Sequence, residues 1–183
     1  IKTLHTMSHL NEQRAVLFYG TETGNTEEVA REIEKRWDIT KLEVINAGEM
    51  TIEDFERFDI IVIGLPTWYD GELQSDFGEF YDEFVTIDFT GKIVALFGLG
   101  DQVGYPDYFV DSLGILGSVI IENGGKIIGM WPRQGYEFDE SKALFNHDLF
   151  YGLPIDVENQ AELTDSRITD WLRQISRELE EIF

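Results

Sequence analysis

Short apolar runs recur along the chain, separated by longer segments of mixed polarity. The runs lie at 15–19, 42–45, 60–63, 93–97 and 126–130. They are short and apolar on both faces, which is typical of parallel β-strands covered by helices on two sides. The pattern therefore predicts five buried strands.

Helical periodicity fills the segments between these runs. Apolar residues repeat at helical spacing in 25–37, 73–84 and 168–182, and 108–121 is mostly apolar. Five strands that alternate with helices predict an α/β fold, a doubly wound five-stranded parallel sheet with helices on both faces. In such sheets ligands bind beyond the carboxyl ends of the strands, where the strand order reverses.

The chain is expected to form a single domain over residues 14–183. Residues 1–13 lack clear periodicity, so we expect a disordered or foreign tail there, with order beginning at Ala15. The stretch 132–160 is too long for a simple connection between a strand and a helix. We expect it to be an insertion that interrupts the region of the fifth strand.

Charge narrows the classes of partner. The chain has 36 Asp and Glu against 14 Lys and Arg, a formal net charge of −22, and no cysteine. The charge disfavours nucleic acids and anionic membranes and favours basic protein surfaces. The lack of cysteine excludes disulfides, thiolate nucleophiles and cysteine-held iron–sulfur clusters. Neither a membrane-length apolar run nor a signal-peptide pattern occurs, so we expect a cytoplasmic location. We also expect a monomer.

The first strand runs into a glycine- and threonine-rich loop, 20–26, that is followed by a helix. Backbone N–H groups, hydroxyl groups and a helix N-terminus together make a phosphate cradle without a cation. The loop lacks the lysine of a Walker motif and the glycine spacing of a dinucleotide fingerprint. An alternative stays open, in which Asn25 and Glu28 form an ordinary capping box that binds no ligand.

Two further loops carry aromatic residues at the same predicted edge of the sheet. Trp68 follows the third strand, and Tyr105 follows the fourth in a stretch that contains three glycines. Each aromatic could simply be a packing residue. A phosphate cradle together with two aromatic loops at one edge favours a planar aromatic phosphate ester as the ligand.

Several motifs in a constant order resemble the flavodoxins. They lie at 21–26, 66–68, 71–76 and 98–102, and segments 135–138 and 156–160 resemble the long-chain branch of that family. The resemblance runs from about Ala15 to the end of the chain. It implies the flavodoxin-like strand order 2-1-3-4-5 and a low-potential, one-electron carrier that holds FMN noncovalently. It implies an electron-transfer protein rather than an enzyme, with no catalytic residues and no metal.

The resemblance also implies which residues hold the FMN. Trp68 and Tyr105 would stack on opposite faces of the ring, and the peptide after Tyr69 would lie near flavin N5. The full set is Thr21, Glu22, Thr23, Gly24, Asn25, Thr26, Pro66, Thr67, Trp68, Tyr69, Asp70, Gly71, Gly98, Leu99, Gly100, Asp101, Tyr105 and Asp156.

Acidic residues dominate the segment next to the expected flavin site. No Lys or Arg occurs between Arg57 and Lys92, whereas the stretch from Asp70 to Asp88 inclusive contains seven acidic residues. This one-sidedness favours docking of basic-surfaced redox proteins, such as a flavin-containing NADPH reductase and electron-accepting enzymes. Two alternatives to the electron-carrier function stay open: a flavodoxin-like NAD(P)H quinone reductase and a flavin-free receiver-type signalling module.

Overall fold

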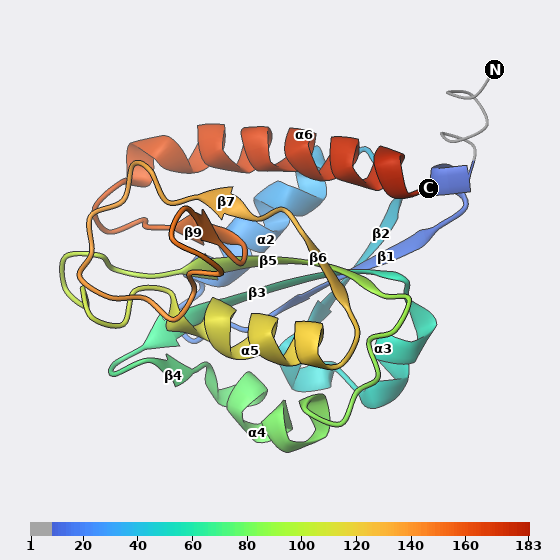
Figure 1. The fold of residues 1–183 in the computed structure, drawn as a ribbon, viewed down its shortest axis with the longest axis horizontal. Coiled ribbons are helices and arrows are strands. Elements are labelled where there is room, and N and C mark those ends of the chain that lie inside the picture. The colour runs from blue at the N-terminus through green and yellow to red at the C-terminus, as the bar shows by residue number, and fades with distance from the viewer. Residues whose placement is uncertain (1–8) are drawn as a thin grey trace.

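The computed structural model describes residues 9–183 and has helices on both faces of a central sheet (Figure 1). The strands are β1 (Arg14–Tyr19), β2 (Lys41–Asn46), β3 (Ile60–Trp68), β4 (Glu72–Leu73), β5 (Ile93–Leu99), β6 (Lys126–Ile128), β7 (Trp131–Pro132), β8 (Leu149–Phe150) and β9 (Leu153–Ile155). The helices are α2 (Asn25–Arg36), α3 (Ile52–Arg57), α4 (Ser75–Phe84), α5 (Asp111–Glu122) and α6 (Thr164–Ile182), with short 3-10 turns at Ala47–Glu49 and Ala161–Leu163. No described helix is both long and apolar enough to cross a membrane.

The parallel sheet has the order β2-β1-β3-β5-β6, which confirms the predicted doubly wound topology. The last position is shared by two strands. The first half of β5 pairs with β6, and its second half pairs with β9, which comes after the segment 132–150. An interruption therefore lies where the sequence places the fifth strand, and β7 and β8 form a separate two-stranded sheet within it.

Two hydrophobic clusters cover the two faces of the sheet. One contains Phe55 of α3, Phe77 of α4 and Leu113 of α5. The other contains Val29 of α2 and Trp171 of α6. Successive residues of β1 alternate between the clusters because side chains along a strand point to opposite faces. The helical periodicity read from the sequence thus corresponds to faces packed on the sheet.

Strand β3 is longer than expected. The sequence predicted an apolar strand over 60–63 only. In the structure Gly64 and Pro66 also pair with β5, and Gly64 is required because a Cβ there would overlap the Phe97 ring. The chain turns only after Trp68 and returns as the short antiparallel strand β4.

Order begins earlier than Ala15, where we expected it. Leu10 is buried and packs in the cluster beneath α2 and α6, and its carbonyl oxygen accepts the Gln13 N–H at 3.0 Å. The expectation of a tail over 1–13 is therefore wrong for Leu10. Residues 1–8 of this predicted tail lie outside the described part of the chain.

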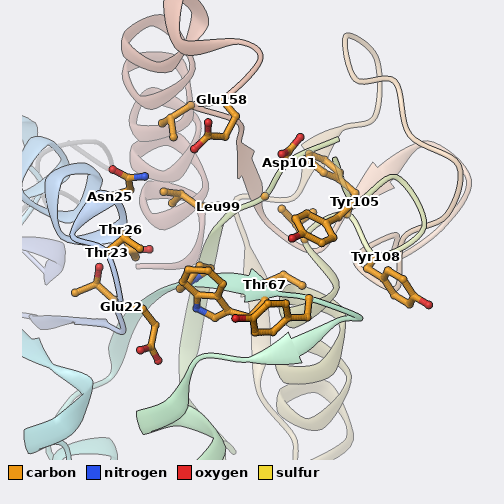
Figure 2. A pocket seen from close by; sticks show the side chains of 18 residues that line it. Glu22, Thr23, Asn25, Thr26, Thr67, Leu99, Asp101, Tyr105, Tyr108 and Glu158 are labelled. Carbon is orange, nitrogen blue, oxygen red and sulfur yellow. The ribbon is translucent and has the colours of Figure 1, made fainter. Parts of the chain in front are cut away.

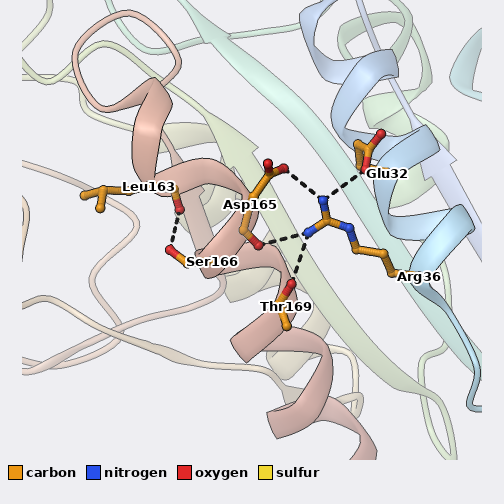
Figure 3. A network of polar contacts seen from close by, with 6 residues as sticks. All are labelled: Glu32, Arg36, Leu163, Asp165, Ser166 and Thr169. Atoms are coloured by element: carbon orange, nitrogen blue, oxygen red, sulfur yellow. Dashed lines mark hydrogen bonds and ion pairs between the residues drawn. The ribbon is translucent and has the colours of Figure 1, made fainter.

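Arg36 joins α2 to α6 at the side of the sheet away from α5 (Figure 3). Its guanidinium donates to the Asp165 carboxylate at 2.9 Å, the Asp165 carbonyl at 2.9 Å, Thr169 Oγ1 at 3.1 Å and Glu32 Oε2 at 3.1 Å. The contacts with Asp165 and Thr169 hold α2 against α6, and the contact with Glu32 lies within α2. The phosphate-cradle loop leads into α2, so they also help to fix where that loop stands.

Candidate functional site

A cavity of about 420 Å³ opens at the carboxyl ends of β1, β3 and β5 (Figure 2). This is the edge at which a doubly wound sheet binds ligands. The predicted site residues that line it are Thr21, Glu22, Thr23, Asn25, Thr26, Pro66, Thr67, Trp68, Tyr69, Leu99, Gly100, Asp101 and Tyr105. The structure thus brings the three predicted loops together around one hollow.

The N-terminus of α2 faces this cavity without a side-chain cap. Gly24 is the N-cap residue, in the left-handed region at φ 96°, and its N–H donates to Thr21 Oγ1 at 2.9 Å. The alternative of a capping box formed by Asn25 and Glu28 is therefore wrong. The first-turn N–H groups of α2 have no side-chain acceptor within the described chain, so they are available to an anion.

Side chains of the same loop add neutral donors. Thr23, Asn25 and Thr26 lie together at one side of the cavity in Figure 2. Among the described residues that line the cavity there is no Lys or Arg, whereas Glu22, Asp101 and Glu158 contribute carboxylates. An anion in this cavity would therefore be bound by backbone dipoles, hydroxyl groups and an amide.

The turn between β3 and β4 forms another wall. Trp68 and Tyr69 line the cavity with their ring centroids 6.0 Å apart, and Tyr69 is 62% exposed in the left-handed region at φ 42°. The Gly71 N–H closes the turn by donating to the Trp68 carbonyl at 3.1 Å. The Trp68 Nε1–H is buried and has no acceptor among the described residues.

Thr67 fixes the end of β3 against the start of α5. Its hydroxyl donates to Ser112 Oγ at 2.9 Å and accepts the Ser112 N–H at 3.0 Å. Thr67 therefore has both its hydrogen-bonding functions used inside the protein, although it lines the cavity. These bonds tie the end of β3, one residue before Trp68, to the start of α5.

The loop after β5 supplies Asp101 and Tyr105 at the side of the cavity away from the cradle (Figure 2). Asp101 Oδ1 accepts the N–H groups of Val103 at 3.1 Å and Gly104 at 2.7 Å, and the Asn159 amide at 2.8 Å. Partial burial raises the pKa of Asp101, but these hydrogen bonds outweigh it, so the pKa lies below its usual value. Asp101 is thus an ionised residue that shapes its own loop.

Five of the predicted site residues are not among those lining the cavity: Gly24, Asp70, Gly71, Gly98 and Asp156. The two glycines at 24 and 71 serve as turn residues with positive φ, and Asp156 is fully buried behind the Asp101 loop. The structure adds lining residues that sequence reasoning missed: Tyr108, Phe109, Val110, Val157 and Glu158. Tyr108 lay inside a predicted helix, and nothing local to Val157 or Glu158 places them here.

Comparison with known proteins decides the family. The flavodoxin family model matches residues 17–171, most of the chain. The chain belongs to the flavodoxin family. It is 45% identical to flavodoxin 1 of Escherichia coli K12 over 163 residues, covering 89% of this chain and 93% of that protein. It is 49% identical to a flavodoxin of Synechocystis over 160 residues, covering 87% and 94% of the two chains.

Solved flavodoxin structures have the same architecture. A Fusobacterium nucleatum flavodoxin bound to flavin mononucleotide matches with a TM-score of 0.86 and 31% identity, covering 91% of this chain and 98% of that one. Oxidised flavodoxin 1 of Bacillus cereus matches with a TM-score of 0.66 and 28% identity, covering 93% and 99%. Flavodoxins transfer electrons and are not enzymes, so neither the quinone reductase nor the receiver module describes this chain.

Proposed function

We propose that this flavodoxin is a low-potential carrier of single electrons that holds one FMN noncovalently. The observation that carries the proposal is the uncapped N-terminus of α2, which opens into a cavity flanked by Trp68 and Tyr105. A phosphate needs the N–H groups, and a flat ring needs the aromatic walls. The names and structures of the relatives support the same cofactor.

The residues present fit that group. Thr21, Thr23, Asn25 and Thr26 would surround the phosphate together with the first N–H groups of α2. Trp68 and Tyr105 would flank the ring, with Asp101 and Glu158 beyond it. When bound, FMN supplies the one-electron chemistry, and the chain supplies binding, orientation and electrostatics.

The charges near the cavity favour a low reduction potential. Glu22, Asp101 and Glu158 contribute carboxylates to its lining, in a chain of net charge −22. Adding an electron to a ring in this environment brings negative charge toward negative charge, which is unfavourable. An electron held there is correspondingly easy to give away.

The expected partners have basic surfaces, such as a flavin-containing NADPH reductase and electron-accepting redox enzymes. Acidic residues of the β3–β4 turn, β4, α4 and the loop after it form what we name the acidic strip: Asp70, Glu72, Asp76, Glu79, Asp82, Glu83 and Asp88. All but the half-buried Asp76 are exposed, and none has a Lys or Arg within 4.0 Å in the described chain. The strip starts beside Tyr69 at the cavity, so it can orient a basic partner toward the flavin.

The visible spectrum of the purified protein tests the cofactor. We expect a flavin spectrum, one flavin per chain, and release of intact FMN on denaturation because the chain has no cysteine to anchor it. The proposal would be contradicted if the bound flavin were FAD, if flavin stayed with the denatured chain, or if the apoprotein did not bind added FMN.

Finer assignments remain predictions that rest on the sequence. We propose that the protein is a long-chain flavodoxin, with one FMN-binding domain over 14–183 and the insertion at 132–160. The separate β7–β8 sheet, which spans residues 131–150, supports this division. A monomeric state and a cytoplasmic location also stay predictions.

A further inference from the structure

Asp156 is a fully buried carboxylate just behind the loop that carries Asp101 and Tyr105. Its Oδ2 accepts the Gln102 backbone N–H at 3.1 Å, the Gln102 side-chain amide at 2.8 Å and the Asn159 amide at 2.9 Å. Its Oδ1 accepts the backbone N–H groups of Glu158 at 3.1 Å and Asn159 at 3.0 Å. Both oxygens are therefore surrounded by donors.

Gln102 extends this arrangement into the segment 132–160. Its side chain is also buried, and its Oε1 accepts the Glu137 backbone N–H at 2.6 Å. The Glu137 backbone N–H can only donate, and a carboxylate at Asp156 can only accept. The Gln102 amide therefore satisfies both neighbours in one orientation, with its oxygen toward Glu137 and its nitrogen toward Asp156. Gln102 thus links Asp156 to the inserted segment.

Asn159 provides a parallel link to the cavity. Its amide nitrogen donates to Asp156 Oδ2 and to Asp101 Oδ1. Asp101 in turn accepts the Val103 and Gly104 N–H groups, and the Tyr105 N–H donates to the Asp101 carbonyl at 2.9 Å. One buried carboxylate is therefore connected by hydrogen bonds to Asp101 and Tyr105, two of the residues of this loop that line the cavity.

We propose that Asp156 is a positioning residue for the ring end of the cavity. It acts through Gln102 and Asn159 to hold the loop 100–105 in the shape that receives the flavin ring, and Glu137 of the inserted segment completes the support. The inference rests on the proposed FMN function. Asp156 itself does not touch the cavity, so its effect on a ligand is indirect.

The isosteric variant Asp156→Asn tests this directly. An amide nitrogen must replace one acceptor oxygen, and at either position it would face at least two N–H donors. Buried donors without acceptors are costly, so we expect roughly a tenfold loss of affinity for both FMN and riboflavin. Affinity for inorganic phosphate should be unchanged because the cradle lies at the other side of the cavity.

The visible absorption bands of bound FMN give a second readout, because a displaced loop changes the surroundings of the ring. General loosening of the fold would weaken phosphate along with the two flavins and would overturn the positioning role. If the wild-type protein binds FMN and Asp156→Asn binds it with the same affinity, the positioning role is also overturned. If the wild-type apoprotein binds no FMN, the proposed function itself fails, so the two failures are distinguishable.

Asn159→Ala keeps the experiment decisive if Asp156→Asn does not fold. Asn159 is exposed, and its removal deletes the link between Asp156 and Asp101. We expect a smaller loss, roughly threefold, again for both flavins and not for phosphate. Asp148→Asn is the matched control, since it removes an exposed carboxylate of the inserted segment and should change no ligand affinity.

A double-mutant cycle tests the route through Gln102. If Asp156 acts through this residue, the flavin-affinity losses of Asp156→Asn and Gln102→Leu should be far from additive when combined, because both disrupt the same connection. Additive losses would show that Asp156 supports the loop without Gln102 and would overturn that part of the proposal.

Discussion

Glu22 Oε1 accepts the Ser75 backbone N–H at 3.0 Å, so a carboxylate of the phosphate cradle is bonded to the first residue of α4. The hydrogen bonds from Ser75 lower the pKa of Glu22 below its usual value. Gln74 strengthens the same junction, since its amide donates to the Thr21 carbonyl at 3.4 Å. The contact ties the Glu22 carboxylate to the start of α4.

We predict that Glu22→Gln and Glu22→Ala affect FMN affinity differently. Glutamine can still accept the Ser75 N–H and removes a negative charge near the phosphate, so we expect affinity equal to or a few times higher than wild type. Alanine removes the charge and the hydrogen bond, so it should bind FMN more weakly than the glutamine variant. Fluorescence titration measures both. Equal affinities would show that the Ser75 contact does not support the cradle.

Trp68→Ala should weaken FMN binding by roughly tenfold, because stacking on an aromatic ring contributes ~0.5–1.5 kcal/mol beyond buried area. Trp37→Ala is the control, since Trp37 lies at the C-terminal end of α2 and does not line the cavity. Quenching of flavin fluorescence by the apoprotein gives both dissociation constants. Similar losses from the two substitutions would argue that Trp68 does not contact the ring.

The sheet and the cradle were predictable because their signals are local. A short apolar run such as Val16 to Phe18 predicts a buried strand from its own composition. The glycines and threonines of the turn at 20–26 are likewise visible in consecutive residues. Each loop could then be placed at one edge by the topology of the sheet alone.

The missed residues depend on long-range pairing. Val157 and Glu158 reach the cavity because β9 pairs with the second half of β5, and no local pattern reveals that partner. Leu10 appeared to belong to a tail because a single apolar residue has no period. The extension of β3 beyond its apolar run depends on pairing with β5, which continues from Gly64 to Pro66.

Asp111→Asn should stabilise the protein at neutral pH. Asp111 is buried at the start of α5 beneath Gly71, and this burial raises its pKa. The Glu140 charge also raises the pKa, whereas the Lys142 N–H at 2.8 Å and the Lys142 charge lower it. The net effect is a raised pKa for Asp111. The folded state therefore binds more protons than the unfolded state between the unfolded pKa of about 4 and the raised folded pKa, and wild-type stability falls as pH rises through that window. An asparagine oxygen can still accept the Lys142 N–H without this cost.

Urea unfolding across pH measures the effect. The stability of Asp111→Asn relative to wild type should grow from about pH 4 upward and then level off. Asp54→Asn is a control of opposite sign. Burial raises the pKa of Asp54, but bonds from Arg57 and Thr51 outweigh it and leave the pKa lowered, so its contribution is present at neutral pH and lost in acid. A pH-independent gain for Asp111→Asn would contradict the assignment.

The acidic strip should act mainly on the rate of partner association. Exposed charges steer encounter more than they hold a complex, and salt screens them as the Debye length falls from ~10 Å at 0.1 M to ~3 Å at 1 M. Neutralising Asp70, Glu72 and Glu79 together should therefore slow electron transfer from a basic-surfaced reductase severalfold at low salt and little at high salt. Asp76 is left intact because its carboxylate accepts the Gln74 amide at 2.8 Å.

The control neutralises three exposed residues, Asp38, Glu180 and Glu181. Asp38 lies just beyond the C-terminal end of α2, and Glu180 and Glu181 lie in the last turn of α6. These ends lie away from the loops after β3 and β5 (Figure 1). Glu178 is avoided because it accepts the Gly129 N–H at 2.6 Å. The two triple variants have the same net charge, so stopped-flow reduction across a salt series separates location from total charge. Equal slowing by both would show that net charge alone governs the encounter and that the acidic strip is not the docking surface.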